Sequence, residues 1–317
     1  MSSIAWLQLL SYLAFLIFAI LFIAKTVRLA TMPIHLRWEL YPVAHEVRHK
    51  SGGSYLEDLD WWTKPQRKNL FGEIKYMMRE GFLFEKCYRN NRGLWYFTYP
   101  FHMGLLLLIV WLALLFIGAL TMLAGMPIAE TANAWAGIVY YLTLGVGIAG
   151  IVLSTFGCVG LLIKRAVDKS LRLYTAPVDY LNLSFILAIL LSELSSWCFF
   201  DPAFNNVRGF TRGLLTFSPV ANVDPAMTTG IVLFSIFLIY MPFTHMMHGL
   251  AKYFTYHRVF WEDEPNLRGS KIEKRVKELL NQPVSWSAPH IQSGKKWSEI
   301  ASSRTEGKWR KEQKERG

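Results

Sequence analysis

Five long apolar segments interrupt the chain, and each is long enough to cross a lipid bilayer as a helix. They are approximately 4–24, 96–123, 136–163, 178–200 and 227–250, and the hydrocarbon core of a bilayer takes about 20 helical residues. Only 18% of the 317 residues are charged, and they cluster between these segments. This pattern excludes a disordered chain, a collagen-like chain and a disulfide-stapled secreted module. We therefore predict an all-α integral membrane protein with five transmembrane helices.

Basic residues are distributed unevenly among the connections. Residues 25–98 contain 13 Lys and Arg, residues 164–177 contain 4 and the tail from residue 251 contains 15, whereas the two other loops contain only Arg208 and Arg212. Cytoplasmic loops carry an excess of Lys and Arg, so we expect the N-terminus outside and the C-terminus in the cytoplasm. The first segment has neither a basic residue before it nor a small-residue cleavage site, which predicts a retained helix and not a signal peptide.

The two long cytoplasmic segments are expected to carry helices. Apolar residues recur at helical spacing in 70–82, which indicates an amphipathic helix lying on the inner membrane surface or beneath a partner subunit. After the fifth span, Ser270 and Glu273 predict a capping box, and Asn281-Gln-Pro283 ends the helix. We accordingly expect a membrane domain over 1–260, including the loop 25–98, and a cytoplasmic helix and arm over 261–317.

The tail beyond this helix spaces Trp286, Trp297 and Trp309 among lysines and polar residues. Tryptophan and arginine anchor protein interfaces, which favours an extended arm lying on a partner protein; attachment to the membrane surface is the alternative. Basic cytoplasmic loops account for the net charge of +11, and no motif that reads a nucleic-acid groove is present. We expect no nucleic-acid partner.

Three of the eight histidines, His102, His245 and His248, lie in or at the edge of predicted spans. Ionisable side chains inside a bilayer are costly and usually functional. His102 is near the start of the second span and His248 near the end of the fifth, so both are expected in the inner leaflet on antiparallel helices. Two such imidazoles suit the axial positions of a haem iron; hydrogen bonding between helices is the structural alternative. Gly104 and Gly249 would make room for a flat ring or let helices approach closely.

The cysteines limit which redox cofactors this chain can bind alone. Cys87, Cys158 and Cys198 lie far apart in the sequence, with no C-x-x-C and no C-x-x-C-H motif. An iron–sulfur cluster needs about four thiolates, so the chain cannot build one alone. It also lacks the attachment signature of a c-type haem.

The residues around the histidines resemble those of a known family. Tyr99-Pro-Phe-His102-Met-Gly and Met241-Pro-Phe-Thr-His-Met-Met-His248 are similar to the respiratory nitrate reductase gamma subunit. Three further motifs resemble its relatives, membrane cytochrome b subunits paired with heterodisulfide-reductase-like iron–sulfur proteins: Arg37-Trp-Glu-Leu-Tyr-Pro42, Tyr253-Phe-Thr-Tyr-His257 and Trp286-Ser-Ala-Pro-His290-Ile. The resemblance covers most of 1–260. It implies a quinone-linked cytochrome b, with His102 and His248 ligating the haem nearer the cytoplasmic iron–sulfur partner.

One haem b is favoured over two. The nitrate reductase pattern has another histidine ten positions after the first and one eighteen positions before the last, where this chain has Leu112 and Gly230. A second haem would need His245 with a loop histidine, namely His35, His45 or His49. The other roles open to His245 are an alternative ligand of the first haem, a propionate partner and a quinone contact.

Glu193, in the outer half of the fourth span, is the only mid-span carboxylate, and Arg208 and Arg212 follow in the outer loop. It is a candidate proton acceptor or quinone partner; a water-exposed residue near a helix end is the alternative. If only the inner haem exists, an outer quinone site would be far from it, because half a span is roughly 15 Å. An inner-leaflet site near His245, Lys25 and Arg28 is then the other interpretation.

These observations predict the haem-bearing subunit of a quinone-dependent oxidoreductase complex in the prokaryotic cytoplasmic (inner) membrane. It would transfer electrons between a menaquinone- or ubiquinone-type pool and a cytoplasmic iron–sulfur subunit, alongside any further redox subunits. The alternative is a non-redox membrane anchor for the same kind of complex, which predicts no haem and tolerance of His102→Ala. A transporter would show inverted repeats, and no repeat is visible in the sequence.

Overall fold

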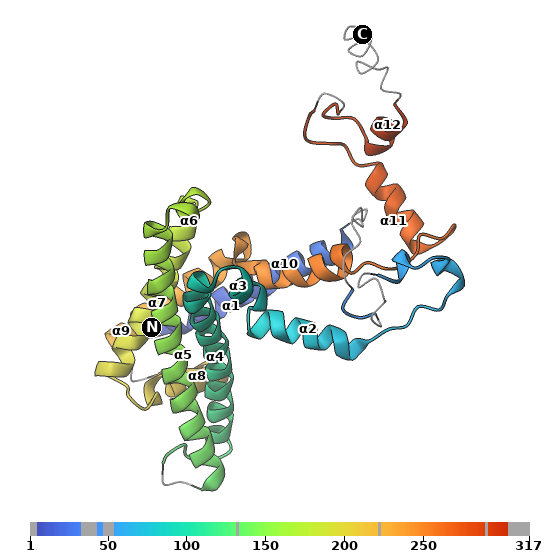
Figure 1. Ribbon diagram of the computed structural model, residues 1–317. Coiled ribbons are helices and arrows are strands. Elements are labelled where there is room, and N and C mark those ends of the chain that lie inside the picture. The colour runs from blue at the N-terminus through green and yellow to red at the C-terminus, as the bar shows by residue number, and fades with distance from the viewer. Residues whose placement is uncertain are drawn as a thin grey trace. The chain divides into compact units, whose positions relative to one another are not determined.

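The computed structural model describes residues 5–32, 43–46, 54–130, 133–220, 223–288 and 291–303 (Figure 1). Helices dominate these residues, and the only β-type pairings among them are three isolated bridges. Five helices are long and apolar enough to cross a membrane. They are α1 (Ala5–Thr31), α4 (Arg92–Leu123), α5 (Ala134–Val167), α7 (Pro177–Phe199) and α9 (Pro225–Tyr240), whose candidate span includes the turn that continues to Phe243. The predicted all-helical architecture with five candidate spans is confirmed.

The remaining elements are shorter. They are η1 (Tyr55–Glu57), η2 (Trp61–Thr63), α2 (Leu70–Phe82), α3 (Glu85–Asn90), α6 (Lys169–Leu173), α8 (Asn205–Thr216), η3 (Met241–Phe243), η4 (His245–Met247), α10 (His248–Thr255), the π-helix η5 (Tyr256–Phe260), α11 (Lys271–Leu280) and α12 (Trp297–Ser302). The chain forms two compact units. The first comprises Met1–Ile23 and Lys75–Met246, and the second comprises Ala24–Ile74 and Met247–Gly317. These units divide the chain differently from the predicted domains, because residues 24–74 group with the C-terminal part.

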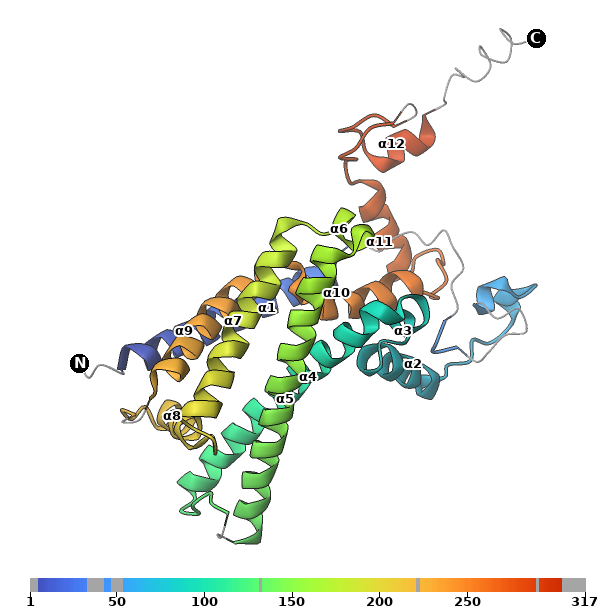
Figure 2. The same ribbon diagram turned by 60° about the vertical axis from the view of Figure 1, so that its left-hand side comes forward.

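The antiparallel helices α4 and α5 lie side by side in the first unit (Figures 1 and 2). Their contact depends on glycines: a Cβ atom at Gly104 would lie 2.3 Å from the backbone nitrogen of Ser154, and one at Gly157 would lie 2.4 Å from that of Phe101. Small residues let membrane helices approach this closely. Gly104 therefore serves close helix packing, one of its two predicted roles. Because the two helices are antiparallel, these contacts place His102 of α4 and Phe156 of α5 at the same height along the helix pair.

The other helices of the first unit pack onto this pair. Leu183, Ile186 and Leu190 of α7 join Phe101 and Cys158 in one buried cluster. Near the other end, Phe204 packs with Trp111 and Leu115 of α4 and Ile151 of α5. The first half of α1 joins through Leu7, which contacts Phe210 of α8 and Met227 of α9.

The sequence predicts one span over 227–250, but the fifth apolar segment is not one continuous helix over this range. α9 ends at Tyr240, two 3₁₀ turns follow, and α10 begins at His248. Pro242 has no backbone N–H to donate to the preceding turn, and Thr244 adopts an extended conformation with φ −107° and ψ 171°. His245 and His248 therefore lie beyond the regular helix.

In the second unit, Ser270 is the N-cap of α11 as predicted, but Glu273 does not complete a capping box, because the Ser270 N–H donates to the Leu267 carbonyl. The Ser270 hydroxyl accepts a hydrogen bond from the Glu273 backbone N–H at 3.1 Å, and the Glu273 carboxylate accepts one from the Gly269 N–H at 2.8 Å. The helix ends at Leu280, as the following Asn281-Gln-Pro283 predicts. Residues 70–82, predicted to form an amphipathic helix, are α2.

The described part of the tail closes on itself instead of extending. The Val284 N–H donates to the Lys295 carbonyl at 2.8 Å, and the Trp297 N–H donates to the Gln282 carbonyl at 3.2 Å. The rings of Trp286 and Trp297 consequently lie 6.2 Å apart. The expectation of an extended arm is thus wrong for these residues, while Trp309 lies outside the described residues.

Candidate functional site

His102 lies in the first turns of α4, among aromatic side chains. Its Nδ1 is 2.8 Å from the Thr98 carbonyl oxygen one turn earlier, and the Phe84 ring lies 4.8 Å from the imidazole. Because a carbonyl can only accept, Nδ1 carries the proton and the neutral ring has its lone pair on Nε2. This is the tautomer in which histidine ligates a metal, with a second group fixing the ring orientation.

His248 is the first residue of α10 and belongs to the second unit. A Cβ atom on the adjacent Gly249 would meet nothing within 4 Å, so this glycine borders open space and not a close helix contact. His245, in the first unit, places Nε2 3.5 Å from Oδ1 of Asp179 near the start of α7, with 59% of its side chain exposed. In this structure His245 therefore contacts the carboxylate of Asp179.

The positions where the nitrate reductase pattern has its second haem ligands are unsuited to that role here. Leu112 is 44% exposed on the surface of α4. At Gly230, a Cβ atom would lie 2.6 Å from Oε1 of Glu193. The glutamate thus takes up the space that a side chain at position 230 would need.

Glu193 lies near a group of carboxylates that cap helices. Asp201 and Asp224 are within electrostatic range of it. Asp201 accepts from the backbone N–H groups of Asn205 and Asn206 at 2.7 Å, which caps α8. Asp224 caps α9 and accepts the Ser196 hydroxyl at 2.9 Å. The role of Glu193 as a proton acceptor or quinone partner stays a prediction.

Arg208, one of the two arginines expected to follow Glu193 in the outer loop, forms its contacts with α4 and α8. Arg208 is only 2% exposed, and its side chain packs against Gly118 of α4. Its Nη1 donates to the Asn205 side chain at 2.9 Å, and burial lowers the pKa of the guanidinium. Within the described residues, no ion pair joins Arg208 to Glu193.

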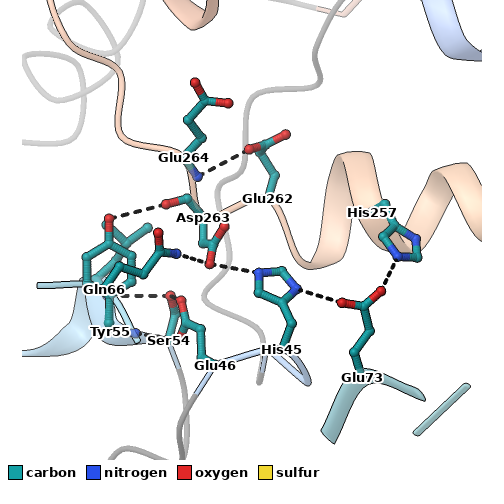
Figure 3. A network of polar contacts seen from close by, with 11 residues as sticks. His45, Glu46, Ser54, Tyr55, Gln66, Glu73, His257, Glu262, Asp263 and Glu264 are labelled. Carbon is teal, nitrogen blue, oxygen red and sulfur yellow. Dashed lines mark hydrogen bonds and ion pairs between the residues drawn. The ribbon is translucent and has the colours of Figure 1, made fainter. Parts of the chain in front are cut away.

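The second unit contains a polar network that the sequence did not predict (Figure 3). His45 lies between two carboxylates, with Nε2 2.8 Å from Asp263 Oδ2 and Nδ1 3.9 Å from Glu73 Oε2. His257 Nε2 is 2.8 Å from the other oxygen of Glu73, and its Nδ1 is 2.8 Å from the Tyr253 carbonyl. Both nitrogens of His45 are therefore directed at carboxylates, which disfavours this residue as a second haem ligand. His35 and His49 lie outside the described residues.

Glu46 is the most deeply buried carboxylate of this network, with 4% of its surface exposed. It accepts hydrogen bonds from the Tyr55 backbone N–H at 2.7 Å and from the Ser54 hydroxyl at 3.1 Å. Burial, with a smaller effect of the neighbouring Asp263, raises the pKa of Glu46 above its ordinary value of 4.5. The ionised form is therefore disfavoured in the folded unit.

This raised pKa predicts a pH-dependent local stability. A carboxyl group whose pKa is higher in the folded state stabilises that state fully below its ordinary pKa and loses this contribution as the pH rises through the folded value. We expect hydrogen exchange at Tyr55, corrected for its intrinsic rate, to show increasing opening as the pH rises above 4.5, the ordinary pKa of the carboxyl group. Glu46→Gln should flatten this dependence, and identical pH profiles in both proteins would refute the assignment.

Among the residues that the structure describes, no group of three or more His, Cys, Asp or Glu could hold a metal ion. A haem iron with two axial histidines does not need such a group. In comparisons with known proteins, no family model matches the chain, and no curated protein matches it.

Proposed function

We propose that this chain is a membrane cytochrome b subunit that transfers electrons between the quinone pool and a cytoplasmic iron–sulfur partner. The observation that supports this most is the geometry of His102. The imidazole lies in a candidate membrane span, its Nδ1 donates to the Thr98 carbonyl, and the rings of Phe84 and Phe101 lie 4.8 and 5.2 Å from it. A histidine whose Nδ1 is oriented by a second group is suited to ligate iron through Nε2.

The residues that would hold the haem are His102 and His248, whereas His245 contacts the Asp179 carboxylate. A bound haem would supply one-electron redox chemistry, and the chain would supply axial ligands, apolar walls and orientation. Glu193 occupies the space that a histidine side chain at position 230 would need, which supports a single haem. Glu193 is proposed as a proton acceptor or quinone contact in the other half of the membrane.

Partner binding is proposed for the cytoplasmic segments. The charge distribution supports an N-terminus outside and a C-terminus in the cytoplasm of a prokaryotic cell. Leu70 and Phe71 of α2 are 66% and 75% exposed, which suits burial beneath a heterodisulfide-reductase-like iron–sulfur subunit or in the inner membrane surface. Further redox subunits would complete the complex.

The proposal is tested by spectroscopy of the purified full chain in lipid nanodiscs. Reduction by dithionite should produce the difference spectrum of a low-spin b-type haem, and reduced menadione should produce the same change. A haem that dithionite reduces but the quinol does not would contradict the quinone link. A chain without haem would leave the membrane anchor as its function.

A further inference from the structure

A groove lies on the surface of the α4/α5 pair, and none of the residues that line it has a role in the site described above. Its volume is about 680 Å³, within the range of about 300–1,000 Å³ that is typical of small-molecule sites. One face of α5 supplies most of the lining, including Phe156, Val159 and Ile163, and Phe97 of α4 adds to it. These side chains are apolar and lie along a candidate membrane span, so the groove suits a long hydrocarbon ligand.

The charged groups of the groove lie at one end. Lys164 Nζ is 3.3 Å from Oδ2 of Asp168, one turn later. Hydrogen bonds from Ser170, Leu171 and Lys164 lower the pKa of Asp168 to about 2, so this carboxylate stays ionised. The two charges cancel, which favours a neutral polar headgroup over an anionic phosphate. Since an ammonium group has three donors, Lys164 can still donate to a carbonyl oxygen.

The groove extends to the level of the candidate haem ligand. Packing of Gly157 on Phe101 and of Gly104 on Ser154 sets His102 level with Phe156, which lines the groove. Lys164 is eight residues further along α5, or about 12 Å at the rise of an α-helix. Leu183 of α7 lies level with Cys158 of α5, because its carbonyl is 3.2 Å from the Cys158 sulfur. A ring bound at Lys164 and a ring bound at Glu193 would thus lie at similar distances along the helices from a haem on His102, on opposite sides of it.

We propose that this groove binds the isoprenoid quinone, with a ring carbonyl accepting a hydrogen bond from Lys164 and the tail lying along Val159 and Phe156. This assignment rests on the proposed function and names the substrate site within it. Asp168 positions the lysine, and burial of the apolar tail supplies most of the binding free energy.

The test is a fluorescence titration of the full chain in nanodiscs with 2-heptyl-4-hydroxyquinoline N-oxide, a quinone analogue with an apolar tail. Val159→Trp should fill the groove, and Lys164→Met should remove the headgroup donor, because methionine has no N–H. Each is expected to weaken binding about tenfold, the effect of about 1.4 kcal/mol. Val152→Trp is the matched control, because Val152 is an exposed residue of α5 outside the groove. It should retain the wild-type affinity. Ile163→Trp replaces Val159→Trp if that variant does not fold.

The possible results separate the two proposals. Equal affinities in all the variants would overturn the groove assignment, as would cross-linking of a photoreactive quinone to residues outside the groove. Phospholipid in the groove by native mass spectrometry, displaced in Val159→Trp without a change in analogue affinity, would also overturn it. The haem spectrum of the same samples tests the proposed function alone, because a missing haem would refute that function whatever the analogue binds.

Discussion

His102→Ala is expected to lower the haem content of the purified protein by about tenfold or more. The imidazole is proposed as an axial ligand, and its orientation is fixed by the Thr98 carbonyl at 2.8 Å. Alanine removes the iron bond without adding bulk, and it is a good helix former, so α4 should persist. His248→Ala should have the same effect. Haem content by pyridine haemochrome, together with circular dichroism, measures both quantities.

His245→Ala is the matched control for these variants. His245 contacts the Asp179 carboxylate at 3.5 Å, and its loss should leave the haem content near that of the wild type. If His102→Ala kept a full complement of haem with an unchanged spectrum, His102 would not be a ligand. Loss of haem in His245→Ala alone would transfer the ligand role to that residue.

Gly157→Ala is expected to destabilise the first unit by about 1–3 kcal/mol, as overpacking does in well-packed cores. The added Cβ atom would lie 2.4 Å from the backbone nitrogen of Phe101. Backbone cannot move aside as a flexible side chain can, so α4 and α5 would have to separate. Since His102 follows Phe101 directly, haem retention should fall as well. The thermal unfolding midpoint in detergent and the haem content are the measurements.

Gly145→Ala provides the comparison on the same helix. A Cβ atom there would meet nothing within 4 Å, so alanine should be neutral or stabilise α5 by about 0.5–1 kcal/mol, the usual cost of glycine in a helix. Equal destabilisation by the two substitutions would show that α5 does not contact α4 in the way described.

Local signals in the sequence predict much of this fold. The five apolar segments identify the candidate spans, Ser270 and Glu273 predict the start of α11, and the apolar spacing in 70–82 predicts α2. Each depends on residues within a few turns of one another. The break after Tyr240 also has a local cause, because Pro242 interrupts the hydrogen-bond ladder. The prediction extended the helix to 250 because the segment stays apolar.

Contacts between distant residues could not be predicted in this way. Glu73 meets His257, which is 184 positions away, and His45 meets Asp263, which is 218 positions away. Nothing near these residues in the sequence specifies the pairing, although the motif ending in His257 was noted. Arg208 was expected near Glu193 because both lie at the outer end of the spans. Its side chain instead packs against Gly118 of α4, a contact that the sequence does not indicate.

The ratio of haem to protein in the purified full chain tests the proposed cytochrome function most directly. Pyridine haemochrome and quantitative amino-acid analysis of the same sample give this ratio. One low-spin haem b per chain is the predicted result, since His102 and His248 offer one pair of ligands and Glu193 takes up the space at Gly230. A chain that contains no haem when freshly prepared would contradict the cytochrome function.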